Sequence, residues 1–226
     1  MAKEVLIIGT GLGGLATALR LTSQGFRVRM VEKHHQAGGR LNQLKAEGFT
    51  FDVGPSFFSM SYEFEELFQS VGLPVPFQLR ELDPCYVVYF RKHSKPFRIY
   101  KDLNRLQAEF EAFEPDFKAK MERYLARAGQ IFHDTEHRIV KRNFSGSTLD
   151  HLWALSQVPW KHAPMMFRSM WSELGRHFES EEVKVIFSLV AFFLGATPFD
   201  TPAVYSLLNY TELKHDGYWN VGGGMY

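Results

Sequence analysis

The chain has little cysteine, almost no net charge and no long apolar run. Its single cysteine, Cys85, excludes an internal disulfide and any zinc site with two or more cysteines. Lys plus Arg number 26 against 25 for Asp plus Glu, so no broad cationic field favours nucleic acid. The longest apolar stretch, Val183 to Leu194, contains Lys184 and Ser188 and is shorter than the roughly 20 residues that cross a bilayer. We expect no nucleic-acid partner and no membrane span.

The N-terminus also lacks a secretory signal. Only the apolar residues Val5 to Ile8 precede the first glycine, whereas a signal h-region needs about 7–15 in a row. A cytoplasmic setting is therefore expected. Apolar residues make up 45% and charged residues 23% of the 226 residues, as in a globular protein of one large or two small domains. The 21 phenylalanines suit either a long apolar ligand or a thick core.

The first 32 residues have the pattern of a strand-helix-strand unit. Val5 to Ile8 is a continuous apolar run, which is typical of a strand buried on both faces of a parallel sheet. The glycine-rich turn 9–14 follows, and then leucines at helical spacing lead to Gly25, the expected C′ residue. Phe26 to Val31 alternates apolar and charged residues, which predicts the second strand, with Glu32 at its carboxyl end.

The rest of the chain changes from short strands to helices. Residues 38–54 predict a glycine-rich loop followed by a hairpin or an extended pair, and short strands are expected at 85–90 and 97–100. From Asp102 onward the apolar spacing is helical. One helix is predicted to start at Glu114-Pro115, with proline in the first position, and another at Ser180.

The turn itself carries a nucleotide-binding pattern. Gly9-Thr10-Gly11-Leu12-Gly13-Gly14 matches G-x-G-x-x-G between a strand and a helix, as that motif requires. Gly9 permits the tight turn, Gly11 lets a diphosphate approach the backbone, and Gly14 lets the helix pack against the strand. Glu32 lies near the expected ~20 residues further on, where a carboxylate accepts hydrogen bonds from a ribose diol. The pattern predicts a dinucleotide site, and both NAD and FAD use such a turn.

Further motifs carry a family resemblance. Gly38-Gly39-Arg40 follows Glu32 at short range, and residues 48–55 have the sequence G-F-T-F-D-V-G-P. With the glycine-rich turn, this combination resembles the FAD-binding region of the amine-oxidase-like flavoprotein superfamily. Gly54-Pro55-Ser56 is similar to the carotenoid desaturase and isomerase branch, typified by bacterial phytoene desaturase. Residues 193–199 and 217–225 resemble the same family's F-x-G-x-x-P-F … G-x-W-x-x-x-G-G stretch.

The resemblance implies FAD as cofactor and a set of residues that contact it. These are Gly9, Gly11, Leu12, Gly13 and Gly14 at the diphosphate, Glu32 at the adenosine ribose, Gly39 and Arg40 along the diphosphate and ribityl chain, and Gly54, Pro55 and Ser56 near the isoalloxazine. Asp52 either caps the following turn or touches the cofactor. An arginine that the superfamily often has before G-G-R is absent here, where Gln36-Ala37 stands. No general base is identified.

The implied fold class is α/β (α+β overall). Residues 1–100 are expected to form the N-terminal part of a Rossmann-type FAD-binding domain with short antiparallel strands. Residues 101–226 are expected to form a mainly helical region that binds substrate and associates with a membrane. A doubly wound sheet needs four or more strands, and only two parallel ones are visible. Because family members are about twice this length, we expect a truncated fold that lacks its C-terminal half.

The implied function is that of an FAD-dependent oxidoreductase that desaturates a carotenoid precursor such as phytoene. A hydroxycarotenoid 3,4-desaturase and a carotenoid cis-trans isomerase remain open. So do a non-catalytic fragment and a binding module similar to the Rab GDP-dissociation inhibitors, which hold prenylated partners. The resemblance does not distinguish which polyene is bound.

An apolar polyene substrate implies peripheral contact with a membrane. Residues 165–171 are rich in Met and aromatic side chains and lie near Lys161 and Arg168. This composition suits either a helix in the membrane interface or an ordinary core helix. Val183 to Leu194 likewise suits either a polyene tunnel or the core.

One further motif points to different chemistry. His133 to His137 matches the H-x-x-E-H pattern of some zinc peptidases. No third ligand is recognisable, so we expect a solvated helix face without a metal.

Overall fold

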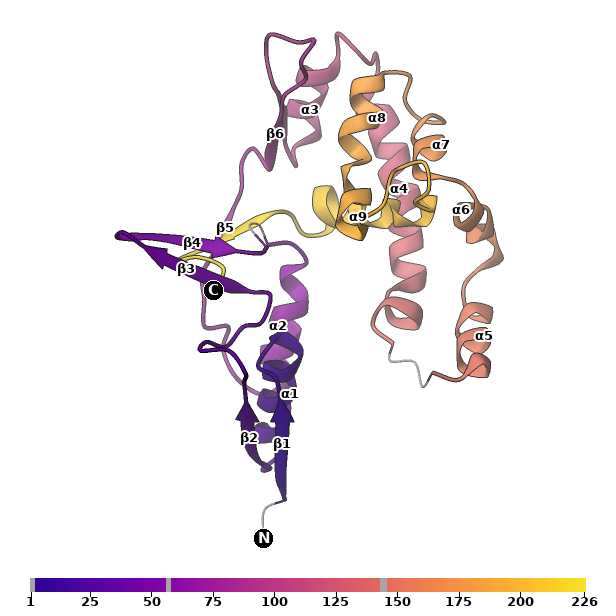
Figure 1. The fold of residues 1–226 in the computed structure, drawn as a ribbon. Coiled ribbons are helices and arrows are strands. Elements are labelled where there is room, and N and C mark those ends of the chain that lie inside the picture. The colour runs from indigo at the N-terminus through magenta and orange to yellow at the C-terminus, as the bar shows by residue number, and fades with distance from the viewer. Residues whose placement is uncertain (1–2, 56–57, 143–145) are drawn as a thin grey trace. The chain divides into compact units, whose positions relative to one another are not determined.

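The computed structural model describes residues 3–55, 58–142 and 146–226. The chain divides into two compact units (Figure 1). Unit 1 consists of Met1–Leu82 and Tyr218–Tyr226, and unit 2 of Asp83–Gly217.

Unit 1 begins with the predicted strand-helix-strand arrangement. Strand β1 (Glu4–Ile8), helix α1 (Leu12–Ser23) and strand β2 (Arg27–Val31) follow one another, and the two strands pair in parallel with Val5 opposite Val28. Gly25 has a φ of +83° directly after the helix, as its predicted C′ role requires. The local pattern therefore specified all three elements and both strands to within one residue, whereas the helix begins at Leu12, inside the segment 9–14 that was predicted as the turn.

The remainder of unit 1 consists of antiparallel pairs and one helix. Strands β3 (Asn42–Ala46) and β4 (Phe49–Val53) form the predicted hairpin, and helix α2 (Ser61–Ser70) follows. Strand β5 (Leu79–Glu81) pairs with β8 (Trp219–Val221), which brings the end of the chain back to unit 1. The sequence pattern predicted none of α2, β5 and β8.

Several large apolar side chains of unit 1 are exposed. Helix α1 has no buried residue, and the side chain of Ile8 is 85% exposed. The other large exposed apolar residues of these strands are Leu6, Val31, Leu44, Phe49, Phe51 and Val53. The prediction that β1 is buried on both faces is therefore wrong for this chain, because each described sheet has two strands.

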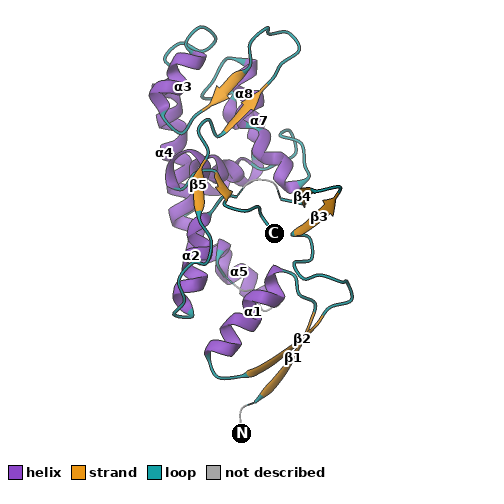
Figure 2. Cartoon of the chain, turned by 90° about the vertical axis from the view of Figure 1, so that its left-hand side faces the viewer, coloured by secondary structure: helices purple, strands orange, loops and turns teal. Residues whose placement is uncertain are grey.

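Unit 2 is mainly helical (Figure 2). Its hairpin consists of β6 (Tyr86–Val88) and β7 (Phe97–Ile99), close to the two predicted strands. Its helices and single turns are α3 (Leu103–Phe110), α4 (Phe117–Thr135), η1 (Glu136–Val140), α5 (Thr148–Ser156), η2 (Trp160–His162), α6 (Ala163–Phe167), α7 (Met170–Leu174), α8 (Glu181–Phe187), η3 (Leu189–Leu194), η4 (Ala203–Ser206), α9 (Leu207–Tyr210) and η5 (Thr211–His215).

Stacked phenylalanines form the core of unit 2. The ring centroid of Phe117 lies 4.8 Å from that of Phe110, 5.9 Å from Phe178 and 6.0 Å from Phe187. All four side chains are buried, and ring pairs at such distances add to the stability that burial supplies. Much of the phenylalanine surplus therefore forms a thick core.

Two helix starts were predicted, with different outcomes. At α8, Ser180 is the N-cap, and its hydroxyl accepts a hydrogen bond from the backbone N–H of Val183, as expected. At α4 the predicted start at Pro115 is wrong, because Asp116 is the N-cap and adopts a φ of +57°. The left-handed residue redirects the chain after Pro115, so the helix begins at Phe117.

Residues 165–171 do not form one amphipathic helix. Helices α6 and α7 are separated by extended backbone at Arg168 and Ser169, and Met165 and Met170 are each only 1% exposed. A membrane-facing role for those two methionines is therefore wrong, because they pack in the interior. Within Val183 to Leu194, α8 is mostly buried, whereas Phe192, Phe193 and Leu194 are exposed.

Candidate functional site

The turn between β1 and α1 is constrained at both ends. Gly9 has a φ of +95°, and its N–H donates to the Val31 carbonyl at 2.8 Å, so the turn is tied to β2. A Cβ on Gly14 would overlap the Gly9 carbonyl oxygen, which explains the requirement for glycine there. Beside Gly11 and Gly13, by contrast, an added Cβ would meet nothing within 4 Å. The turn is therefore packed tightly at Gly14, whereas there is free space beside Gly11 and Gly13.

The G-G-R motif lies against this turn. Gly11 and Gly38 form an isolated parallel bridge, in which the Gly38 N–H donates to the Thr10 carbonyl at 2.8 Å. A Cβ on Gly39 would lie 3.1 Å from the Cα of Gly11. The structure thus brings together two glycine motifs that are well separated in sequence, and the small size of glycine permits the close approach.

Glu32 stabilises the turn from the end of β2. Its carboxylate accepts hydrogen bonds from the backbone N–H and hydroxyl of Thr10, at 2.9 and 2.8 Å, and from the His34 N–H at 3.0 Å. These bonds, that of the His34 N–H foremost, lower the pKa of Glu32 from 4.5 to about 2. A carboxylate has about four acceptor positions, so a ribose hydroxyl can still bind.

The G-F-T-F-D-V-G-P segment, residues 48–55, also contacts the G-G-R segment. Gly54 has a φ of +122°, and a Cβ there would overlap the Arg40 carbonyl oxygen, so the two backbones are in contact. Pro55 follows as an exposed residue, and Ser56 lies outside the described residues. Arg40 is exposed and has no ion-pair partner among the residues that the structure describes, which leaves its guanidinium available to an anion.

The end of the chain completes this cluster. Asp52 accepts hydrogen bonds from the backbone N–H groups of Met225, at 2.7 Å, and of Tyr226, at 3.3 Å. A Cβ on Gly38 would lie 3.0 Å from the Tyr226 ring. Asp52 therefore holds the C-terminal glycine-rich stretch, a role that sequence analysis missed. The G-x-W-x-x-x-G-G resemblance was the signal that this stretch belongs near the motifs.

These residues fit a diphosphate cofactor. Leu12 is the first residue of α1, and no side chain caps that helix, so its first N–H groups are available as donors. Open space lies beside Gly11 and Gly13, and Arg40 adds a cation directly after Gly39, whose backbone lies against Gly11. The helix N–H groups and Arg40 thus supply positive potential at the turn, and there is room there for a diphosphate. Glu32, at the edge of the turn, can accept a hydrogen bond from a neutral hydroxyl group.

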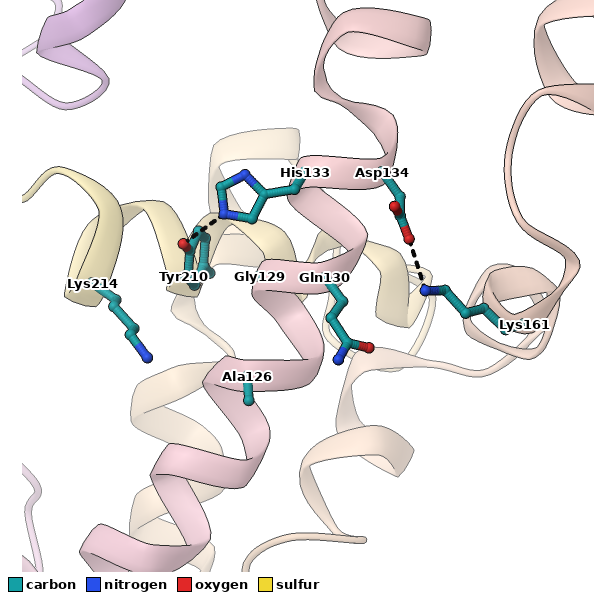
Figure 3. Close-up of a pocket in the computed structure, with 8 residues that line it drawn as sticks. All are labelled: Ala126, Gly129, Gln130, His133, Asp134, Lys161, Tyr210 and Lys214. Carbon is teal, nitrogen blue, oxygen red and sulfur yellow. Dashed lines mark hydrogen bonds and ion pairs between the residues drawn. The ribbon is translucent and has the colours of Figure 1, made fainter.

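The H-x-x-E-H segment has no metal-binding geometry. His133 shares a 2.9 Å hydrogen bond with the Tyr210 hydroxyl (Figure 3), and His137 lies 3.9 Å from the Glu136 carboxylate. Within the described part of the chain, no three His, Cys, Asp or Glu side chains are grouped so that they could hold a metal. In the same part, no helix combines the length and apolarity needed to cross a bilayer.

Curated proteins similar to this chain include carotenoid enzymes. The chain is 35% identical to the zeta-carotene-forming phytoene desaturase of Myxococcus xanthus, over 99% of its own length and 43% of that protein. It is 33% identical to a phytoene desaturase of Phycomyces blakesleeanus, over 99% of its length and 38% of that protein. A 4,4'-diapolycopene oxygenase of Methylomonas is 31% identical over 99% of the chain and 45% of that protein. The chain thus spans about two fifths of these relatives.

Solved structures share the fold at low identity. A Pyrococcus furiosus protein matches with a TM-score of 0.55 and 16% identity, over 98% of this chain and 46% of that one. A putrescine oxidase variant matches with a TM-score of 0.55 and 19% identity, over 100% of this chain and 47% of that one.

The family comparison covers almost the whole chain. Residues 12–225 match the family described as flavin containing amine oxidoreductase. This match confirms the superfamily resemblance and the flavin cofactor expected from the motifs, and it includes all three glycine motifs apart from the first residues of the turn. The chain belongs to the family of flavin-containing amine oxidoreductases.

Proposed function

We propose that the chain is the N-terminal part of an FAD-dependent carotenoid desaturase, acting on a precursor such as phytoene. The observation that carries this proposal is the convergence of the 9–14 turn, Gly38-Gly39-Arg40 and Gly54 in unit 1, with Glu32 beside them. The similarity to named phytoene desaturases over 99% of the chain supports the substrate class.

In this proposal each motif has one task. The α1 N-terminus and Gly9, Gly11, Leu12, Gly13 and Gly14 bind the diphosphate, Glu32 the adenosine ribose, Gly39 and Arg40 the diphosphate and ribityl chain, and Gly54, Pro55 and Ser56 the isoalloxazine side. FAD supplies the hydride acceptor for forming a new double bond. Asp52 positions the C-terminal stretch 222–226 and is not assigned to the cofactor.

Unit 2 is proposed to carry the polyene-binding and membrane-associated region. A long hydrocarbon substrate resides in a bilayer, so peripheral membrane contact is part of the proposal. The desaturase names of the relatives favour this reaction over an isomerase, a 3,4-desaturase or a flavin-free binding module.

The test of the cofactor site is flavin retention by the full 226-residue chain. The chain is incubated with FAD and passed over a gel-filtration column, and the visible absorbance of the protein peak is recorded. We expect bound oxidised flavin. Glu32→Ala should weaken FAD binding, because it leaves the N–H groups of Thr10 and His34 without their acceptor and removes the carboxylate assigned to the ribose. His35→Ala, a nearby exposed loop residue, is the control.

Two results would count against the proposal. An unchanged FAD affinity in Glu32→Ala would remove the assigned role of that residue. Absence of any flavin from the wild-type peak would show that unit 1 does not form a cofactor site by itself. For the substrate, phytoene supplied in liposomes to the flavin-loaded chain, with product chromatography, tests desaturation directly.

A further inference from the structure

Unit 2 contains a groove that the flavin motifs do not involve. It has a volume of about 380 Å³ and runs along α4 (Figure 3). Small residues of α4, Ala126 and Gly129, form its floor, where a Cβ on Gly129 would lie 2.6 Å from the Tyr210 ring. The α9–η5 segment forms one wall and η2 the other, so helices distant in sequence build one shared depression.

The side chains around this groove favour an anion. Lys214 and Lys161 come from opposite walls, and Gln130 lies between them on α4. Neither Lys214 nor Gln130 has a hydrogen-bond or ion-pair partner among the described residues. The two lysines therefore offer ammonium donors, and the Gln130 amide adds a neutral one.

One carboxylate also lines the groove, and its charge is already balanced. Asp134 accepts from His162 Nε2 at 2.8 Å and from Lys161 Nζ at 3.0 Å. The hydrogen bond with His162, followed by that with Lys161, lowers the pKa of Asp134. Lys161 retains further N–H donors, since an ammonium group has three. With Lys214 unpaired by any described residue, the groove keeps a net positive character.

The wall that carries Lys161 also carries exposed aromatic side chains. Trp160, next to it in η2, is 86% exposed, and Phe167 at the end of α6 is 90% exposed. The neighbouring helix α5 exposes Leu149, Leu152, Trp153 and Leu155. Exposed apolar surface of this extent is typical of protein or membrane contact, and Trp is favoured at the bilayer interface.

We propose that the groove binds the phosphate of an anionic lipid headgroup through Lys161 and Lys214, while Trp160 and Phe167 enter the adjacent bilayer interface. A lipid is favoured over a soluble phosphate because one cation of the groove, Lys161, shares the short segment 160–167 with the exposed aromatic residues Trp160 and Phe167. This inference rests on the peripheral membrane association in the proposed function and assigns it to residues other than the buried Met165 and Met170.

The experiment is co-sedimentation of the full chain with vesicles. One set contains phosphatidylcholine alone, and the other equal parts of phosphatidylcholine and phosphatidylglycerol. The variants are Lys161→Gln/Lys214→Gln and Trp160→Ser/Phe167→Ser. Matched controls come from the β6–β7 hairpin region: Lys95→Gln/Arg98→Gln removes two exposed cations, and Tyr89→Ser removes an exposed aromatic ring.

We expect tighter binding to the anionic vesicles. The double lysine variant should lose roughly 10- to 30-fold of that binding, at about a factor of five per surface cation, and should keep its binding to neutral vesicles. The aromatic variant should lose binding to both sets, and the controls should match wild type. Millimolar inorganic phosphate should not displace the chain from anionic vesicles.

Three outcomes would overturn the inference. Equal losses in the lysine variant and its hairpin control would show a general charge effect. Displacement by inorganic phosphate, with Lys214 resonances shifting on phosphate alone, would identify a soluble anion as the ligand. If the wild-type chain binds neither vesicle set, the membrane association in the proposed function is contradicted as well. The cofactor part of that proposal is tested separately, by flavin retention.

Discussion

The two units of this protein differ most in how they use apolar residues. Unit 2 buries aromatic rings against each other around α4, whereas unit 1 leaves several large apolar side chains of its short strands exposed. Unit 1 nevertheless contains the close backbone contacts of the candidate flavin site. The geometry of the candidate site in unit 1 therefore depends on glycine turns and backbone hydrogen bonds, whereas unit 2 is stabilised mainly by the burial of apolar side chains.

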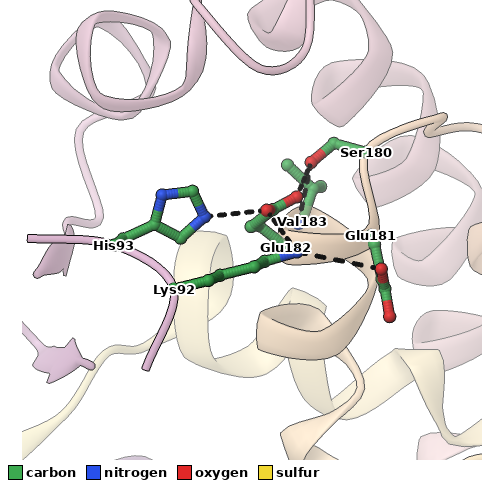
Figure 4. A network of polar contacts seen from close by, with 6 residues as sticks. All are labelled: Lys92, His93, Ser180, Glu181, Glu182 and Val183. Atoms are coloured by element: carbon green, nitrogen blue, oxygen red, sulfur yellow. Dashed lines mark hydrogen bonds and ion pairs between the residues drawn. The ribbon is translucent and has the colours of Figure 1, made fainter. Parts of the chain in front are cut away.

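The units also differ in how they hold an ionised carboxylate. Glu32 and Glu182 each have a pKa lowered to about 2. For Glu32 the main cause is the backbone N–H donors. For Glu182 it is Lys92 and then His93, whose side-chain nitrogens each lie 2.8 Å from a carboxylate oxygen (Figure 4). The Ser180 hydroxyl also donates to this carboxylate, at 3.0 Å. Lys92 also lies 3.8 Å from Glu181. Similarly lowered pKa values thus arise from backbone N–H dipoles for Glu32 and mainly from Lys92 for Glu182.

The largest expected effect is on the core of unit 2. Phe117→Ala should destabilise the protein by about 3–5 kcal/mol, because the ring is fully buried and leaves a cavity. Phe49→Ala in unit 1, at a ring that is 65% exposed, should cost less than about 1 kcal/mol. Denaturant unfolding followed by fluorescence measures both changes. Equal costs would show that the apolar surface of unit 1 is covered in solution.

A smaller effect is expected at the glycine turn. Gly14→Ala should weaken unit 1 by about 1–3 kcal/mol, since its Cβ would collide with the rigid Gly9 carbonyl. Gly13→Ala meets nothing within 4 Å and should be neutral or stabilising. Hydrogen exchange of the β1 and β2 amides, without FAD, compares the two. Similar protection would mean that the turn relaxes at little cost.

Acid should remove a further contribution from both units. The folded pKa values of Glu32 and Glu182 lie below the ordinary 4.5, so their stabilisation is complete above about pH 4.5 and declines as the pH falls toward 2. Carboxyl resonances followed by NMR across this range measure both groups. A midpoint near 4.5 for either group would contradict the bonding described for it.

The smallest expected effect separates the two causes of the low pKa. Lys92→Met removes an exposed cation, so its effect on stability should be small. It should raise the pKa of Glu182 and leave that of Glu32 unchanged, because the backbone donors of Glu32 remain. Added salt should act in the same direction on Glu182. The same NMR titration decides the point, and a parallel shift of Glu32 would refute the distinction.

Much of the candidate site could be predicted because its motifs are local. G-x-G-x-x-G between a strand and a helix specifies the turn, and the β1–α1–β2 unit formed as predicted. The contact of Gly11 with Gly38 was implied only by resemblance, and the hydrogen bond that the Met225 N–H donates to Asp52 was missed. Neither contact leaves a periodic signal, since each joins residues distant along the chain.

Burial was the other property that pattern alone misjudged. The continuous apolar run of β1 is typical of a covered strand, yet cover depends on neighbouring strands that local sequence does not supply. Residues 165–171 have an amphipathic composition, but an extended break at Arg168 directs Met165 and Met170 inward. In both segments the sequence shows which side chains are apolar, but it does not show whether neighbouring elements cover them.

Short-range patterns were enough to predict the glycine turn, the hairpin, the Ser180 helix start and the family, because these depend on backbone conformation and local spacing. The pairing of β8 with β5, the hydrogen bonds of Asp52 with the C-terminal stretch, and the set of exposed aromatic side chains emerge only in the folded chain. These features join or surround residues that are distant along the chain, so the packing of a whole unit selects them and no short stretch of residues encodes them.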